Sequence, residues 1–131
     1  MKLRRLHLAF GLLLFVAFLV TGQFMRRDFP DKSLIDQEFR LLMRSRHIYI
    51  LLVSLSHILL GIYFVGVRRW IQYAGSALLF AGALSVLYAF VFETYTVHGY
   101  SQFSRNGLYL SLYGTVFHVI GGFRLQSGTN E

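Results

Sequence analysis

Apolar residues in this chain are gathered into four long blocks that short polar segments separate. The blocks cover residues 6–24, 48–67, 70–92 and 107–123. A helix rises about 1.5 Å per residue and the hydrocarbon core of a bilayer is roughly 30 Å thick, so each block is about long enough to span it. The pattern predicts an all-α integral membrane protein, a single membrane domain over residues 1–131 with four transmembrane helices in a bundle.

The segment between the first two blocks has an amphipathic pattern of its own. Pro30 and Asp31 predict a turn, and Ser33 followed three residues later by Asp36 resembles a capping box. Apolar side chains then recur at helical spacing with charged ones between them. This favours an interfacial helix over about residues 34–46 that continues into the second spanning helix, and a solvated connector is the alternative.

The second and fourth blocks share an order of residue types. Segments 45–61 and 104–122 both begin Ser-Arg, then place an aliphatic-Tyr-aliphatic triplet, a histidine, and a glycine four residues after that histidine. The match indicates a duplicated helical hairpin with a long insertion in the first copy. Such a direct repeat would have a pseudo-two-fold axis along the membrane normal.

Composition supports a membrane location and narrows the chemistry. Of the 131 residues, 55% are hydrophobic and only 15% are charged, against about 25% charged in soluble domains. The chain has no cysteine, which excludes disulfides, thiolate-ligated metals and covalently attached c-type haem. The net charge of +7 comes from Lys and Arg at the ends of the apolar blocks, so these are interpreted as interfacial anchors and no nucleic-acid partner is expected.

The N-terminus has the character of a signal sequence. Basic residues at Lys2, Arg4 and Arg5 precede an apolar run, which is interpreted as an uncleaved signal anchor and first spanning helix. Counted over the whole chain, the thirteen Lys and Arg residues are almost evenly divided between the two sides, six against seven, so the first helix decides the orientation. The expectation is the inner membrane of a bacterium, with both termini in the cytoplasm.

Two histidines stand out because they fall inside apolar blocks. His57 lies eleven residues after Arg46 and His118 thirteen after Arg105, which places both roughly 16 to 20 Å from the same boundary. Polar side chains facing lipid are costly, so the stripes that carry them should face inward. The stripes comprise Ser54, His57 and Gly61 in the second helix, and Ser111, Thr115, His118 and Gly122 in the fourth.

Two level, inward-facing histidines on parallel helices are an arrangement that can ligate a b-type haem. Neighbouring glycines would give the macrocycle room, and a hydroxyl could orient an imidazole. The sequence therefore predicts haem b and a small electron-transfer protein or membrane subunit of a redox complex. The candidate cofactor-binding residues are His57, His118, Gly61, Gly114, Gly122, Ser54 and Thr115.

Other functions remain open at this stage. In one, the protein is a non-catalytic membrane scaffold or accessory subunit in which the same histidines only pack helices together. In another, an oligomer conducts protons or ions. Whether the protein is an enzyme is left open, although no serine-histidine-carboxylate set and no phosphate-binding loop is visible. The expected partners are the lipid bilayer and other membrane subunits or further copies of the chain.

The remaining histidines lie near the ends of the apolar blocks. His47 and His98 fall on the same side and are candidate ligands for a copper or zinc ion or a second haem, with ordinary surface histidines as the alternative. His7 lies at the opposite boundary and is expected to be an interfacial residue.

Overall fold

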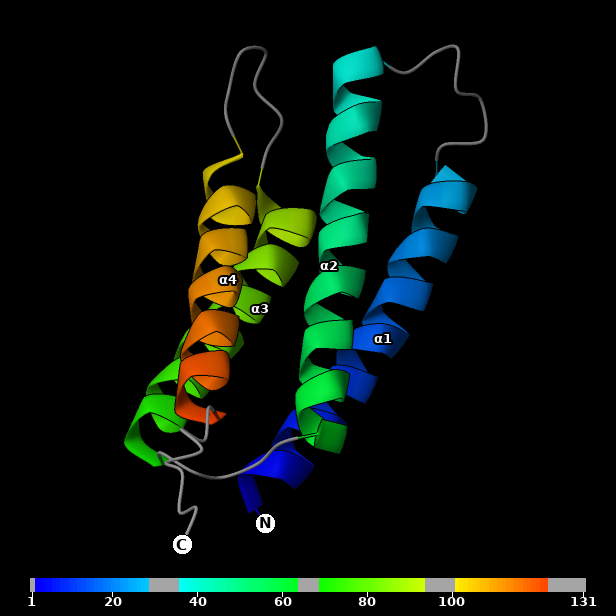
Figure 1. Cartoon of the computed structure of the whole chain (residues 1–131). Coiled ribbons are helices and arrows are strands. Elements are labelled where there is room, and N and C mark those ends of the chain that lie inside the picture. The colour runs from blue at the N-terminus through cyan, green and yellow to red at the C-terminus, as the bar shows by residue number, and fades with distance from the viewer. Residues whose placement is uncertain (1, 29–35, 64–68, 94–100, 123–131) are drawn as a thin grey trace, which may run out of the picture.

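The computed structural model describes residues 2–28, 36–63, 69–93 and 101–122. It contains four helices: α1 (Lys2–Asp28), α2 (Gln37–Tyr63), α3 (Arg69–Phe92) and α4 (Gln102–Gly122). They run alternately up and down along one axis (Figure 1). We call the end where α1 begins and α2 ends the basal end, and the opposite end the distal end.

The helices are arranged as two hairpins. α1 packs against α2 and α3 packs against α4, and the hairpins meet mainly where α2 lies beside α3. The largest cluster of buried apolar side chains joins them. Its buried members are Leu14, Met43, Ile50, Val53, Ala83, Val86 and Phe90. The unit of two hairpins agrees with the predicted organisation, while duplication itself stays a prediction.

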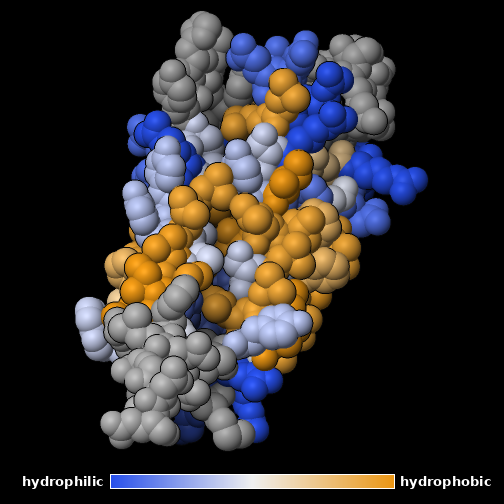
Figure 2. All heavy atoms as spheres, viewed as in Figure 1, coloured by the Kyte–Doolittle hydropathy of each residue, from blue (hydrophilic) through white to orange (hydrophobic). Residues whose placement is uncertain are grey.

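The outer surface of the bundle is apolar across its middle. Figure 2 shows a belt of hydrophobic side chains between hydrophilic ends, and large residues such as Leu13 and Val20 are 63% and 60% exposed. α1, α2 and residues 70–92 of α3 are long and apolar enough to cross a membrane, whereas α4 is not among the helices that qualify by that measure. An apolar belt of this extent is typical of a surface covered by lipid.

The predicted helix over 34–46 forms the first part of α2, and its predicted continuation into the second spanning helix is confirmed, while its place at the membrane interface stays a prediction. Residues from Gln37 onward belong to α2, which is one continuous helix because no proline or glycine interrupts it before Gly61. Met43 belongs to the core cluster and Phe39 packs against it, so these two apolar side chains contact the rest of the bundle. The cap is Asp36, whose carboxylate accepts a hydrogen bond from the Phe39 amide at 3.3 Å; Ser33 lies outside the described residues.

Glycines permit the closest helix contacts in both hairpins. A Cβ on Gly61 would lie 2.6 Å from Leu8 Cα, and one on Gly114 would lie 2.6 Å from the Gly75 carbonyl oxygen. The α1–α2 and α3–α4 backbones therefore approach where only hydrogen occupies the side-chain position.

Candidate functional site: a buried histidine cluster

Each of the four helices contributes one polar side chain to a single buried cluster. His57 of α2 and His118 of α4 are 0% and 5% exposed, so both face inward as predicted. His7 of α1 and Ser76 of α3 lie with them and are 0% and 3% exposed. The expectation that His7 is interfacial is wrong, because α1 begins at Lys2 and carries His7 into the bundle.

A continuous chain of hydrogen bonds links the four side chains. His57 Nδ1 lies 2.8 Å from His7 Nδ1, and His7 Nε2 lies 2.8 Å from Ser76 Oγ. Ser76 Oγ lies 2.9 Å from His118 Nε2 and also donates to the Gln72 carbonyl oxygen at 2.8 Å. The chain therefore crosses the bundle from α2 through α1 and α3 to α4.

When the Ser76 hydroxyl donates its proton to the Gln72 carbonyl, that donation assigns the protons on the three neutral rings. The hydroxyl has a single proton and the Gln72 carbonyl can only accept it, so both imidazole nitrogens beside Ser76 must donate. His7 Nε2 then carries the proton of that ring, and His7 Nδ1 must accept from His57 Nδ1. The lone pair of His57 is left on Nε2.

His57 Nε2 has no hydrogen-bond partner among the residues that the structure describes, although it is buried. The Phe10 and Phe80 rings lie against this imidazole, with centroids 5.0 Å and 4.8 Å away. A buried nitrogen with a lone pair can accept a proton or coordinate a metal. Within the described helices, however, no group of three His, Asp or Glu side chains is arranged to hold a metal ion.

The arrangement leaves little room for haem between the two predicted ligands. His7 and Ser76 connect His57 to His118, and the His7 ring centroid lies 4.9 Å from that of His57 and 5.4 Å from that of His118. A macrocycle between His57 and His118 would displace both linking side chains. The geometry as it stands does not fit a haem ligated by this pair.

Of the other predicted cofactor-binding residues, Ser54, Gly61 and Gly114 lie at contacts between helices, whereas Thr115 and Gly122 do not. Ser54 donates to the Gly11 carbonyl oxygen at 2.9 Å and so joins α2 to α1. Thr115 donates within its own helix to the Ser111 carbonyl oxygen at 2.9 Å. At Gly61 and Gly114, atoms of neighbouring helices occupy the space that a side chain would need. Of the three glycines, only Gly122 faces open space, with no atom within 4 Å of an added Cβ.

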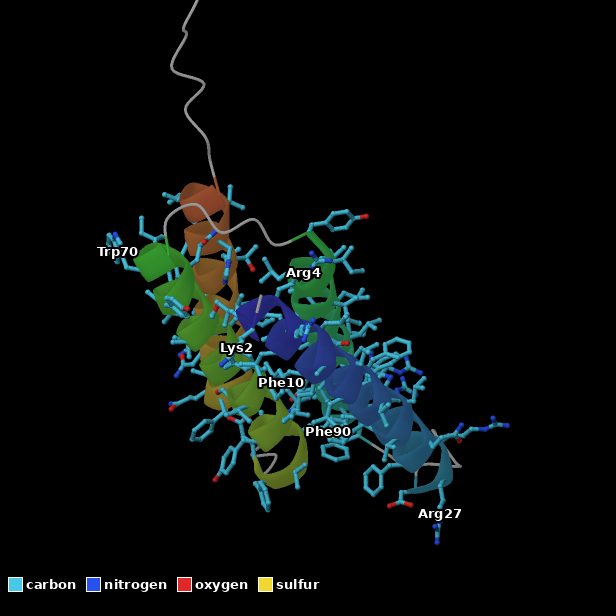
Figure 3. All side chains as sticks on the ribbon, turned by 90° about the horizontal axis from the view of Figure 1, so that it is seen from below. Lys2, Arg4, Phe10, Arg27, Trp70 and Phe90 are labelled. Carbon is cyan, nitrogen blue, oxygen red and sulfur yellow. The ribbon has the colours of Figure 1, made fainter. Side chains whose placement is uncertain are left out.

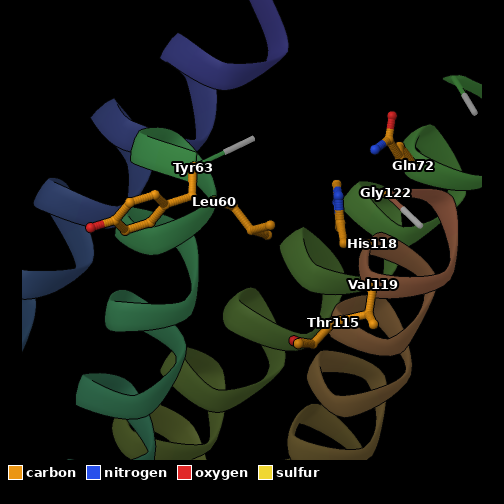
Figure 4. Close-up of a pocket in the computed structure, with 7 residues that line it drawn as sticks. All are labelled: Leu60, Tyr63, Gln72, Thr115, His118, Val119 and Gly122. Atoms are coloured by element: carbon orange, nitrogen blue, oxygen red, sulfur yellow. The ribbon is translucent and has the colours of Figure 1, made fainter. Parts of the chain in front are cut away.

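A basal cleft lies between the two hairpins beside His118. It has a volume of about 240 Å³ and separates Leu60 and Tyr63 of α2 from His118 and Gln72 (Figure 4). The cleft also includes Gly122, which explains the open space at that residue.

At the distal end, His47 belongs to no group of three His, Asp or Glu side chains within the described residues, and the predicted metal site with His98 stays a prediction. The His47 ring stacks on Phe18 at a centroid distance of 4.2 Å, and its Nδ1 lies 3.0 Å from the Thr21 hydroxyl oxygen. The proposed companion His98 lies outside the described residues. Glu93, which stands near this end, is instead paired with Arg46.

The Arg46–Glu93 pair forms a second buried polar contact between the hairpins. Arg46 is 2% exposed and donates to the Glu93 carboxylate at 3.0 Å and to the Glu93 carbonyl oxygen at 2.8 Å. Ser101 accepts from the same guanidinium and donates to the carboxylate. An arginine with so little exposure is costly unless paired, and Glu93, whose side chain is 13% exposed, supplies that pairing, so this contact holds α2 against the end of α3.

Sequence reasoning missed His7, Ser76 and the role of Arg46. A signal for His7 was present, because Arg4, His7, Gly11 and Leu14 follow one another at spacings of three or four and form a stripe on α1. For Arg46 the signal was its spacing, because Arg46, Ile50, Val53 and His57 follow one another at intervals of three or four residues and so share one face of the helix. For Ser76 there was only its position among small residues.

Comparison of the chain with models of protein families, with curated proteins and with solved structures gave no match. The fold, the apolar belt and the buried polar cluster define a helical membrane protein.

Proposed function

We propose that this protein is a non-catalytic integral membrane scaffold or accessory subunit whose buried polar residues hold two helical hairpins as one unit. The observation that carries the proposal is the His57–His7–Ser76–His118 chain, which draws one side chain from each helix. Interhelical hydrogen bonds of this kind are a recognised source of helix association in membranes.

The surroundings of the cluster support a structural role. The glycines beside it admit close backbone contacts, and the Ser54 hydroxyl is bonded to the α1 backbone. Polar contacts thus join the helices near both ends of the bundle, while the outer surface is left apolar for lipid or for another membrane subunit.

The test is the effect of removing the histidines from purified protein in mild detergent. We expect colourless protein, and we expect His7→Ala, His57→Ala and His118→Ala to lower the melting temperature without changing any absorption band. A preparation whose histidine variants melt like the parent protein contradicts the proposal.

A second candidate function is electron transfer through haem b, which His57 Nε2 favours because it is a buried imidazole nitrogen without a partner in the described residues. Haem would supply one-electron redox chemistry, and His7 and Ser76 would have to move to admit it. Absorption spectra of protein expressed with excess haem precursor, oxidised and dithionite-reduced, distinguish the two functions. A low-spin spectrum lost in both His57→Ala and His118→Ala supports haem, and its absence from folded protein excludes it.

We further propose that α4 is a fourth span and that the basal end faces the cytoplasm of a bacterial cell. α4 packs along α3 and exposes apolar side chains such as Leu112, Val116 and Ile120. The basic start of α1 favours a cytoplasmic location for that end.

The fourth span is tested by a reporter joined after Glu131. Four spans place both termini on the same side, so green fluorescent protein fused there should fluoresce and alkaline phosphatase should be inactive. The reverse result indicates that α4 does not cross, or that the orientation is opposite. A second pair of fusions at the N-terminus separates those two explanations.

A further inference from the structure

The basal end of α1 and α2 carries a pocket that two arginines help to line. The pocket has a volume of about 280 Å³ and is lined by Arg4, Arg5, Leu8 and Gly61. Arg4 Nε donates to the Gly61 carbonyl oxygen at 2.8 Å, which fixes that guanidinium over the end of α2. Figure 3 shows Arg4 beside the end of α2 and Arg27 at the opposite end of α1.

The charges at this end have no carboxylate to pair with among the described residues. All four carboxylates in the described ranges, Asp28, Asp36, Glu38 and Glu93, lie at the distal end. Arg5 is exposed and makes no hydrogen bond or ion pair to a described residue. The start of α1 adds further positive potential, because the first amides of a helix have no partner within it.

The pocket lies where the polar part of the chain meets the apolar belt. Arg4 and Arg5 immediately precede the apolar block that starts at Leu6, and Leu8 forms the apolar wall one turn further in. An occupant therefore meets guanidinium groups at the depth of lipid headgroups and an aliphatic surface at the depth of acyl chains.

From this geometry we propose that Arg4 and Arg5 bind the phosphate of an anionic phospholipid whose acyl chain covers Leu8. The terminal nitrogens of a guanidinium suit two phosphate oxygens at once. Arg4 keeps those nitrogens available because its contact with α2 uses Nε. The inference does not depend on the scaffold proposal.

The experiment titrates the purified full-length protein in detergent with short-chain phosphatidylglycerol and with matched phosphatidylcholine, and measures binding by native mass spectrometry. We expect a preference for phosphatidylglycerol, which Arg5→Gln weakens about fivefold. Arg5 is the residue to change because it makes no hydrogen bond or ion pair to another described residue. Arg27→Gln is the matched control, since it removes one exposed charge from the other end of α1 and should leave binding unchanged.

Equal binding of the two lipids overturns the proposal, as does equal weakening by Arg5→Gln and Arg27→Gln. A parallel titration with inorganic phosphate and with glycerol phosphate tests the source of the anion. Binding of those soluble anions as tightly as phosphatidylglycerol, with the same loss in Arg5→Gln, would assign the pocket to free phosphate and overturn the lipid assignment.

Discussion

At the scale of single residues, the main problem is how three imidazoles can be buried within an apolar bundle. Each buried N–H or lone pair without a partner is unfavourable. Ser76 resolves most of this, since its oxygen accepts from His7 and His118 while its proton goes to the Gln72 carbonyl. One nitrogen, His57 Nε2, remains without a described partner.

Replacing Ser76 by Ala should destabilise the protein much more than a comparable serine substitution elsewhere. It removes the shared acceptor of two buried imidazole N–H groups, and each unsatisfied donor costs about 1 to 3 kcal/mol. Thermal unfolding in detergent measures the effect. Ser56→Ala is the control, because Ser56 donates only to the Leu52 carbonyl of its own helix; equal melting temperatures for the two variants would refute the role of Ser76.

Of the four side chains in this cluster, the sequence pattern predicted that two, His57 and His118, face the interior of the bundle. His57 and His118 were recognisable because each interrupts an apolar block on a stripe of small and polar residues. His7 was not, since it lies two residues after Arg5, in a basic segment that resembles a membrane boundary. Its burial depends on how far α1 extends past its apolar block and on which turn of α2 it meets, and neither is encoded in local periodicity.

At the scale of helices, contact between backbones is set by glycine. The α1–α2 crossing places Leu8 against Gly61, and the α3–α4 contact places Gly75 against Gly114. Without a hydrophobic force between helices in lipid, such close packing supplies much of the association energy. Gly61 and Gly114, two of the three glycines predicted to make room for a cofactor, therefore allow close contact between helices.

Gly61→Ala should separate α1 from α2. The added methyl would lie 2.6 Å from Leu8 Cα, so one backbone must shift, at a cost of about 1 to 3 kcal/mol. Gly122→Ala is the control, because nothing lies within 4 Å of its Cβ position, and we expect a change within about 0.5 kcal/mol. Equal unfolding curves for Gly61→Ala and the parent protein would contradict the close crossing of α1 and α2 at this glycine.

Helix existence was predictable, but helix boundaries were not. The apolar blocks locate all four helices, yet α1 runs from Lys2 to Asp28 rather than over 6–24, and α4 starts at Gln102 rather than near residue 107. The charged residues from 38 to 46 resemble a membrane surface in sequence. Arg46 is instead buried by pairing with Glu93, which is 47 positions away, and a pairing at that distance cannot be inferred from periodicity.

At the scale of the whole molecule, the two hairpins are joined by polar contacts near opposite ends. The histidine cluster lies toward the basal end, where His57 is six residues before the end of α2. The Arg46–Glu93 pair lies at the distal end. Two separated contacts resist rotation of one hairpin against the other, which a single contact would permit.

The distal contact should therefore be as important to stability as the histidine cluster. Glu93→Gln leaves the Arg46 guanidinium buried without its counter-charge, and we expect a loss of roughly 3 kcal/mol in unfolding free energy. Arg44→Gln is the matched control, since Arg44 is exposed and lies half a turn away. Thermal unfolding of the three proteins in one detergent measures the difference.

The double variant Arg46→Met, Glu93→Leu distinguishes two causes of instability: an unpaired buried charge and the loss of contact between α2 and the end of α3. Because it removes both charges together and keeps apolar volume, we expect it to be less destabilised than Glu93→Gln alone. If the double variant is instead the least stable, the polar contacts to Ser101 and to the Glu93 carbonyl hold the hairpins together rather than the ion pair. If Glu93→Gln melts like Arg44→Gln, the distal pair does not hold the hairpins together, and their association depends on the basal cluster and on the apolar core.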